Sequence, residues 1–190
     1  MPSSSRDDAP DAPREVIRPL LRARQVREFT PEPPTPDQLA AILDAARWSG
    51  SSQNSQPWRF IVIRHIGSIR AIANAGMTLT RSLQTATVAV AIVLPINPER
   101  ATSLAYDEGR VAERILVAAG MLGLGAAIAW IKTDARSVVT ELLGLPPDRM
   151  VRTIMAIGWP TDAARAPKTP PGTARLPREL VVFGERWPAG

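Results

Sequence analysis

The sequence predicts an α+β fold, and three observations lead to this class. Helical and strand-like stretches are mixed along the 190 residues without the regular strand–helix–strand alternation of a doubly wound sheet. The apolar run TATVAVAIVLPI at 85–96 is typical of a central strand that is buried on both faces. With 45% hydrophobic residues, the chain can bury one sizeable core without metals or disulfides. We therefore expect a sheet packed against helices.

The chain begins with a polar tail that leads into a helix. Residues 1–13 are rich in Ser, Asp and Pro and are expected to be disordered, which leaves 14–190 as a single domain. A first helix is predicted over 15–23, provided that Pro19 lies in its first turn, where its missing N–H is not needed. Neither a secretory signal nor a membrane-spanning stretch is recognisable, so we expect a cytoplasmic protein without membrane contact.

The second helix has the clearest start signal in the chain. Thr35 fits an N-cap, Pro36 the first helical position, and Gln38 the partner of Thr35 in a capping box. We expect this helix to end near Trp48, directly before a polar loop. Its buried face is predicted from apolar residues at helical spacing, namely Leu39, Ile42, Leu43 and Ala46.

Helices and strands of ordinary length follow. The pattern predicts a strand over 60–63, a helix over 68–74, the buried strand at 85–96, a long helix over 107–122, a strand over 126–131, a helix over 134–143 and a strand over 153–159. The buried face of the long helix is expected to consist of Val111, Ile115, Ala118, Ala119 and Leu122. The last thirty residues are rich in Pro and offer no element before the segment ELVVFG.

The glycine-rich stretch GMLGLG at 120–125 resembles part of a dinucleotide-binding fingerprint. Such a fingerprint follows a strand and opens a helix, whereas this stretch closes a helix and precedes a strand. We therefore expect it to cap the long helix.

Composition limits the chemistry. The chain has no Cys and one His, which excludes disulfides, thiolate catalysis and clustered Cys/His metal sites. His65, beside Arg64 at a strand end, is expected on the surface without a catalytic role. The formal net charge of +5 comes from Arg residues that are scattered along the sequence, so we do not expect nucleic-acid binding. A few Arg residues directed at one phosphate group explain the same excess of basic over acidic residues. Catalysis by this chain is therefore expected to depend on a cofactor.

Several segments occur in the order and spacing of a known family. They are ARQVREF, WSGSSQNSQPWRFIVI, GLGAAIAWI, and IMAIGWP followed by ARLPRELV. Over about residues 16–183 the chain resembles the nitroreductase superfamily of FMN enzymes, and the NSQPW motif at 54–58 is the most specific part. The resemblance implies a central, mostly antiparallel sheet flanked by helices, in a domain-swapped homodimer with two FMN sites at its interface.

The resemblance also implies which residues hold FMN. A phosphate dianion calls for Arg, and the polar edge of the flavin ring calls for amides. The residues expected at the phosphate and ribityl chain are Arg24, Gln25, Arg27 and Arg175. The residues expected along the ring are Ser49, Gly50, Ser51, Ser52, Asn54, Gln56, Ile128 and Ala129, with the loop contributed by the other subunit.

These assignments have alternatives. Arg24 and Arg27 are alternatively solvated charges at a helix end, and Asn54 and Gln56 alternatively satisfy backbone groups of their loop. The Trp residues expected to pack in the interior are Trp58, Trp130 and Trp159, with Trp130 alternatively bordering the ring.

The chain also departs from the family pattern. Ala23 stands where the family often has a basic residue and Gln25 where it has Ser, so phosphate contacts are fewer or come from Arg22. The connection 95–106 is short, which predicts an open or differently shaped substrate pocket. In the ring loop the departures are Ser49, Gly50, Ser52 and Gln53.

The resemblance implies an FMN-dependent oxidoreductase with a ping-pong mechanism. NAD(P)H gives a hydride to flavin N5 and leaves, and a nitroaromatic, a quinone or a related acceptor then takes the electrons in the same place. No side-chain acid, base or metal is needed. The alternatives are a same-fold oxidase or dehydrogenase of a peptide-like or other small substrate, and a flavin-binding protein without turnover.

Overall fold

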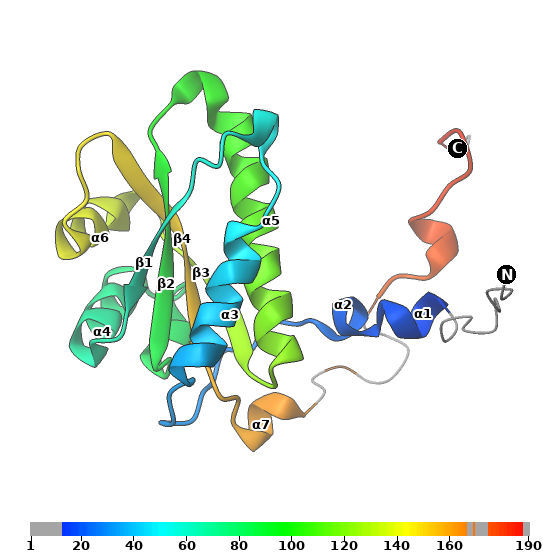
Figure 1. The fold of residues 1–190 in the computed structure, drawn as a ribbon, viewed down its shortest axis with the longest axis horizontal. Helices are drawn as coiled ribbons and strands as arrows, with labels where there is room; N and C mark the ends of the chain where they lie inside the picture. The colour runs from blue at the N-terminus through cyan, green and yellow to red at the C-terminus, as the bar shows by residue number, and fades with distance from the viewer. Residues whose placement is uncertain (1–12, 167–168, 170–174, 188–190) are drawn as a thin grey trace, which may run out of the picture.

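A four-stranded antiparallel sheet lies between two layers of helices in the computed structural model (Figure 1). The strands are β1 (Arg59–Ile63), β2 (Val88–Pro95), β3 (Gly125–Trp130) and β4 (Arg149–Gly158), in the spatial order β1-β2-β4-β3. One face is covered by α3 (Pro36–Arg47) and α5 (Ala101–Met121), and the other by α4 (Ile66–Ala75) and α6 (Arg136–Leu143). The α+β class and the antiparallel sheet are thus confirmed.

The structure describes residues 13–166, 169 and 175–187, so the expected tail lies outside the described residues apart from Pro13. The remaining short elements are α1 (Pro13–Val16), α2 (Arg18–Arg22), α7 (Asp162–Arg165) and the 3-10 turns η1 (Ser52–Asn54), η2 (Arg81–Gln84), η3 (Pro98–Arg100), η4 (Thr133–Ala135) and η5 (Arg178–Leu180). None of the helices in the described part of the chain has the length and apolar character needed to cross a membrane.

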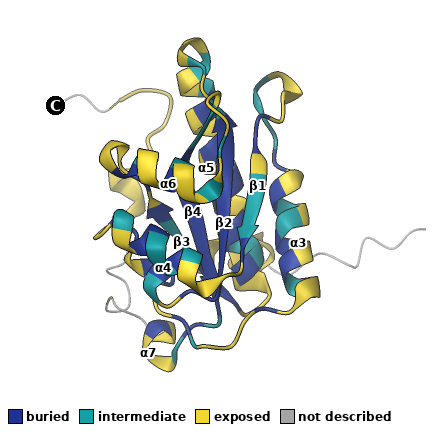
Figure 2. Cartoon of the chain, turned by 90° about the vertical axis from the view of Figure 1, so that its left-hand side faces the viewer, coloured by how far each residue is buried: buried dark blue, intermediate teal, exposed yellow. Residues whose placement is uncertain are grey.

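Strand β2 forms the centre of the core, as the sequence predicts. Successive side chains alternate between the two faces of the sheet. Ala89, Ala91 and Val93 pack under α4 and α6. Val88, Val90, Ile92 and Leu94 pack under α3 and α5. Figure 2 shows β2 and its neighbour β4 as the buried middle of the molecule.

The predicted capping box of α3 is confirmed. The Thr35 hydroxyl accepts from the Gln38 N–H at 3.2 Å, and the Gln38 side chain accepts from the Thr35 N–H at 2.9 Å. The helix ends at Arg47 with Trp48 as its C-cap, so the polar loop begins where the sequence places it.

Helix α5 begins six residues before its predicted start. The Asn97 side chain accepts from the Arg100 N–H at 3.2 Å and caps η3, which runs directly into α5. At the other end, the Gly123 N–H donates to the Gly120 carbonyl and the Leu124 N–H to the Ala119 carbonyl, with Gly123 at φ +76°. This Schellman arrangement confirms that GMLGLG caps a helix.

Other predicted boundaries shift for local reasons. The first helix is divided into α1 and α2 at Ile17, which places Pro19 in the first turn of α2. The helix predicted over 134–143 begins as η4, β4 begins four residues before its predicted start, and ELVVFG contributes only part of η5.

The three Trp residues differ in burial. Trp58 is 5% exposed, as predicted, and Trp159 is partly buried against the core under α3 and α5. Trp130, at the end of β3, is 52% exposed, so the prediction that it packs in the interior is wrong for the single chain.

Residues 24–30 pair with the rest of the chain at two points, beside β3 at Ala126 and just after the end of β4 at Pro160. The Val26 N–H donates to the Ala126 carbonyl at 2.9 Å, and the Thr30 N–H donates to the Trp159 carbonyl at 2.8 Å. A Cβ atom on Gly125 would lie 2.6 Å from the Val26 Cβ, so the segment approaches β3 as closely as it does because Gly125 has no side chain.

We expect Gly125→Ala to destabilise the protein by about 1–3 kcal/mol, because residues 24–30 must move away from β3. Chemical denaturation measures the change. The matched control is Gly120→Ala, where a Cβ meets no atom within 4 Å and the helical position favours Ala by up to about 1 kcal/mol. Equal stability of the two variants would contradict the close packing.

Candidate functional site

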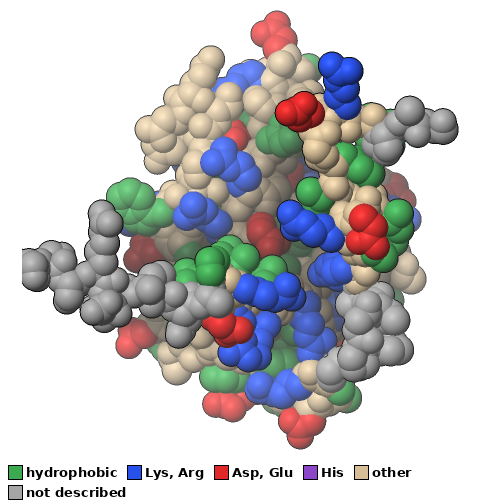
Figure 3. Space-filling model, turned by 90° about the vertical axis from the view of Figure 1, so that its right-hand side faces the viewer, with side chains coloured by type: hydrophobic (Ala, Val, Ile, Leu, Met, Phe, Trp, Pro, Cys, Tyr) green, Lys and Arg blue, Asp and Glu red, His purple; other side chains and the backbone are tan. Residues whose placement is uncertain are grey.

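The side of the molecule that carries α5 holds two regions with polar side chains. Figure 3 shows Lys and Arg gathered across the middle of this side, with apolar side chains between them. We call residues 24–27 together with β3 the edge region, and residues 49–56 together with the first half of α5 the loop region.

The edge region brings three of the predicted site residues together. The Gln25 side-chain oxygen accepts from the Ile128 N–H at 3.3 Å and from the Arg27 guanidinium at 3.2 Å. Ile128 is half-buried and Arg27 is exposed. Ala129 is fully buried in the core under α4 and α6, so only its backbone is available to a ligand. The region therefore presents one guanidinium and one fixed amide beside the sheet edge.

Arg24 is separated from this group. In an extended segment neighbouring side chains point to opposite sides. The Arg24 guanidinium donates to the carbonyls of Ala164 at 2.8 Å and Arg165 at 2.6 Å, at the end of α7. Its charge is thus held by backbone oxygens, whereas the Arg27 guanidinium lies on the side of Gln25.

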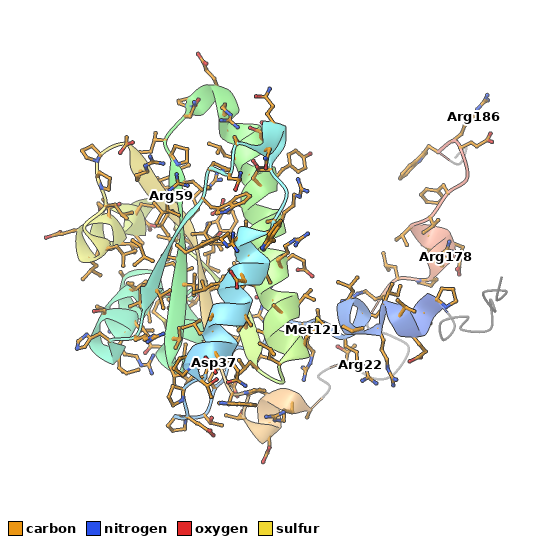
Figure 4. The ribbon with its side chains drawn as sticks, viewed as in Figure 1. Arg22, Asp37, Arg59, Met121, Arg178 and Arg186 are labelled. Carbon is orange, nitrogen blue, oxygen red and sulfur yellow. The ribbon has the colours of Figure 1, made fainter. Side chains whose placement is uncertain are left out.

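A groove of about 840 Å³ lies on the Arg24 side of the segment. Arg22 of α2 and Met121 at the end of α5 both border it, and Figure 4 labels the two side chains. Its basic lining residues are Arg18, Arg22, Arg24 and Arg165. One acidic residue, Glu15, also lines the groove and pairs with Arg18 at 2.9 Å, so the groove carries a net positive charge. Arg22 is the residue that the sequence suggests as a substitute for the basic residue missing at position 23.

The loop region has a strained backbone. Gln53, Asn54 and Gln56 have φ values of 53°, 52° and 44°, a conformation that costs side-chain-bearing residues on the order of 1 kcal/mol each. The Ser51 hydroxyl accepts from the Gln56 N–H at 2.9 Å, and Arg100 at the end of η3 donates to the Ser55 hydroxyl, also at 2.9 Å. Strain of this kind is concentrated at functional sites.

Two adjacent buried carboxylates on α5 hold this region. Both Asp107 oxygens accept from the Ser52 N–H, at 3.0 and 3.2 Å. Glu108 forms an ion pair of 2.6 Å with Arg152 of β4. Arg152 is the extra residue of a β-bulge, because Ile92 of β2 pairs with Thr153 and the next residue of β2 pairs with Val151.

The sequence reasoning missed both carboxylates. One face of α5 is buried along its length. It carries Leu104, Glu108, Val111 and Ile115, which are three or four residues apart. Because the long helix was predicted to begin at Asp107, the buried face before Val111 was not recognised.

The remaining loop residues differ in accessibility. Ser49 is 5% exposed, and its hydroxyl has no hydrogen bond within the described residues. Gly50 lies against the Arg110 guanidinium of α5, which a Cβ atom would displace. The half-buried predicted residues are Gly50, Ser51 and Ser52, and the exposed ones are Asn54 and Gln56.

Beside this loop, the outer face of α5 lines a shallow groove of about 930 Å³. Tyr106 and Arg110 are among its walls, and Gly109 has open space where a side chain would be. Asp107 and Met121 are fourteen residues apart on α5, which is about 21 Å along a helix axis. Figure 1 shows loop 49–56 beside the start of α5 and the segment after α2 beside its end, so the loop region and the edge region do not form one compact site within a single chain.

Two further predicted residues lie elsewhere. Arg175 belongs to the exposed segment 175–187, which leaves the body on the side of α5 in Figure 1. His65 is exposed, as predicted, and its Nδ1 accepts from the Ser68 N–H at 3.2 Å as the cap of α4. Among the described residues, no group of three His, Cys, Asp or Glu is placed to hold a metal ion.

Comparison with known proteins gives consistent similarities. A family model described as the Nitroreductase family matches residues 20–92. The chain is 34% identical to the oxygen-insensitive NADPH nitroreductase of Salmonella typhimurium strain LT2, over 90% of this chain and 74% of the relative. It is 27% identical to the NADPH-flavin oxidoreductase of Vibrio harveyi, over 90% and 74% of the two chains. The fold matches that of an FMN-dependent nitroreductase from Clostridium difficile R20291 with a TM-score of 0.76 and 22% identity, over 88% and 98% of the chains.

Proposed function

This chain belongs to the nitroreductase family, and we propose that it is an FMN-dependent oxidoreductase that takes electrons from NAD(P)H. Nitroaromatics, quinones and related small molecules are the proposed acceptors, reduced in a ping-pong sequence. The names of the relatives support an NADPH-linked, flavin-related activity. The observation that carries the proposal is the edge region, where Arg27 and Gln25 lie side by side against Ile128 of β3.

The residues of both regions have the donor chemistry that FMN requires. Arg27 and Arg175 are proposed to bind the phosphate, since guanidinium groups bind phosphate oxygens in pairs. The loop 49–56 is proposed to lie along the ring edge with its serine and amide groups. When bound, the flavin supplies the hydride and electron transfer, while the protein orients it and excludes competing reactions.

The role of Arg24 is proposed to be smaller than the family pattern implies. Its guanidinium is already held by two carbonyl oxygens of residues 164 and 165. Arg22, the last residue of α2, is proposed to replace the basic residue that is absent at Ala23.

The proposed assembly is a homodimer in which each flavin site combines the edge region of one chain with the loop region of the other. In one chain loop 49–56 lies beside the start of α5 and the segment after α2 beside its end, which supports a shared site. Helices as short as α1 and α2 are not stable alone, yet all their residues are exposed. Large apolar side chains exposed on residues 13–22 and on segment 175–187 are Val16, Ile17, Leu20, Leu21, Leu176, Leu180, Val181, Val182, Phe183 and Trp187. Surfaces of this kind are typical of interaction sites, and a second copy is the proposed partner.

The purified protein is expected to carry or take up FMN and to lose its yellow colour when NADH or NADPH is added without oxygen. Addition of a nitroaromatic or a quinone should then restore the flavin absorption. Absorption spectroscopy measures both steps. A protein that binds FMN but is not bleached by either nucleotide is a flavin-binding protein without this turnover, and one that takes up no flavin contradicts the proposal.

Arg27→Ala is expected to weaken FMN binding about ten- to a hundredfold, because a hydrogen bond to a charged group contributes about 1.5–3 kcal/mol. Arg175→Ala should act similarly, whereas Arg24→Ala should have a smaller effect. Titration with riboflavin, which lacks the phosphate, is the control and should change little. Equal losses for FMN and riboflavin in the Arg27 variant would contradict the phosphate assignment.

Ala105→Glu on the outer face of α5 is expected to reduce dimerisation and flavin binding together, because a shared site links the two equilibria. Light scattering and flavin titration measure the two effects. The control is Val138→Glu on α6, which is also exposed but lies on the opposite face of the sheet. This variant should retain both dimerisation and flavin binding. A stable monomer with full flavin occupancy would contradict the shared site.

A further inference from the structure

We propose that Asp107 is a positioning residue, which fixes the shape of loop 49–56 before any ligand binds. The inference concerns the conformation of the loop itself, and its consequence for flavin binding rests on the proposed function. Asp107 is 2% exposed and lies on the inner side of α5, so it is not expected to contact the ring.

The contact between Asp107 and the loop is specific. Both carboxylate oxygens accept from one backbone donor, the Ser52 N–H, at 3.0 and 3.2 Å. A buried carboxylate is stable only when hydrogen-bond donors compensate for its lost hydration. Movement of the loop would remove this donor from a charge that water reaches poorly, so the loop and the carboxylate stabilise each other.

Ser52 is the residue at which the unusual part of the loop begins. It is the first residue of η1, and its carbonyl accepts from the Ser55 N–H at 3.1 Å. The next two residues, Gln53 and Asn54, both have positive φ. Fixing the Ser52 N–H therefore fixes where this strained turn starts and which way the following polar groups face.

Asp107 is itself held on a firm support. The next residue, Glu108, forms the 2.6 Å ion pair with Arg152 at the bulge of β4. Two further residues contact the loop, since Arg100, the N-cap of α5, donates to Ser55 and Arg110 of α5 lies against Gly50. The position of the loop is thus tied to α5, and the position of α5 is tied to the sheet.

A role limited to fold stability is the alternative. In that case, loss of the carboxylate lowers the melting temperature, but folded molecules bind ligand as before. A positioning role predicts a change in the loop and in ligand affinity at temperatures well below melting. These two outcomes can be measured separately.

The experiment compares Asp107→Ala and Asp107→Asn with the wild type. Asp148→Asn serves as the control, because Asp148 is an exposed aspartate paired with Arg149. In the protein without flavin, hydrogen exchange of the Ser52 amide, followed by NMR, is expected to accelerate at least tenfold in Asp107→Ala and less in Asp107→Asn, which keeps one acceptor oxygen. Asp148→Asn should exchange as the wild type does.

Flavin titration of the same proteins supplies the second readout. Asp107→Ala is expected to lose at least tenfold in affinity for FMN and for riboflavin alike, because the two ligands share the ring. This pattern differs from that of Arg27→Ala, where only FMN is affected. If Asp107→Ala fails to fold, Asp107→Asn provides the test. This variant is expected to lose affinity for both FMN and riboflavin, by a smaller factor than Asp107→Ala.

Unchanged Ser52 exchange in a folded Asp107 variant overturns the proposal, and so does wild-type affinity for both flavins. If the wild type itself binds no flavin, the proposed function fails and the consequence for flavin binding fails with it. In that case, hydrogen exchange of the Ser52 amide still tests whether Asp107 positions the loop.

Discussion

The packing of α5 against the sheet is the interaction on which the rest of the structure depends. Its inner face contributes Leu104, Val111, Ile115 and Ala119 to the core, while its outer face is exposed along a groove. Near its start it holds the polar loop, and its glycine cap turns the chain into β3, the strand beside which the edge region forms. One helix therefore fixes the positions of both candidate regions.

Where structure follows from local chemistry, the sequence predicted it well. The α3 capping box needs only residues within one turn, and the burial of β2 on both faces is visible in an uninterrupted apolar run. The early start of α5 was equally local, because Asn97 and Pro98 form a cap and a first helical turn. It was missed because the apolar face was followed only from Val111 onward, so the turn that carries Leu104 was not included.

Features that depend on distant parts of the chain were not predictable in this way. The bulge that presents Arg152 to Glu108 exists only in the pairing of β4 with β2. Arg24 and Arg27 were grouped because both match the family's phosphate-binding segment, but the extended backbone directs them to different partners. Trp130 was expected in the interior, and it is exposed as the last residue of β3, an edge strand of the four-stranded sheet.

The order of the strands has a consequence for how the chain folds during synthesis. Strand β2 finds its first neighbour, β1, earlier in the chain, but its second neighbour, β4, is made about 50 residues later. At about 5–20 residues per second, ribosomes need several seconds to complete that interval. Throughout this time one edge of the most apolar strand has no pairing partner, and such edges promote aggregation. The nascent chain is therefore most vulnerable to aggregation while α5, β3 and α6 are being made, and newly made chains depend on chaperone protection most in this interval.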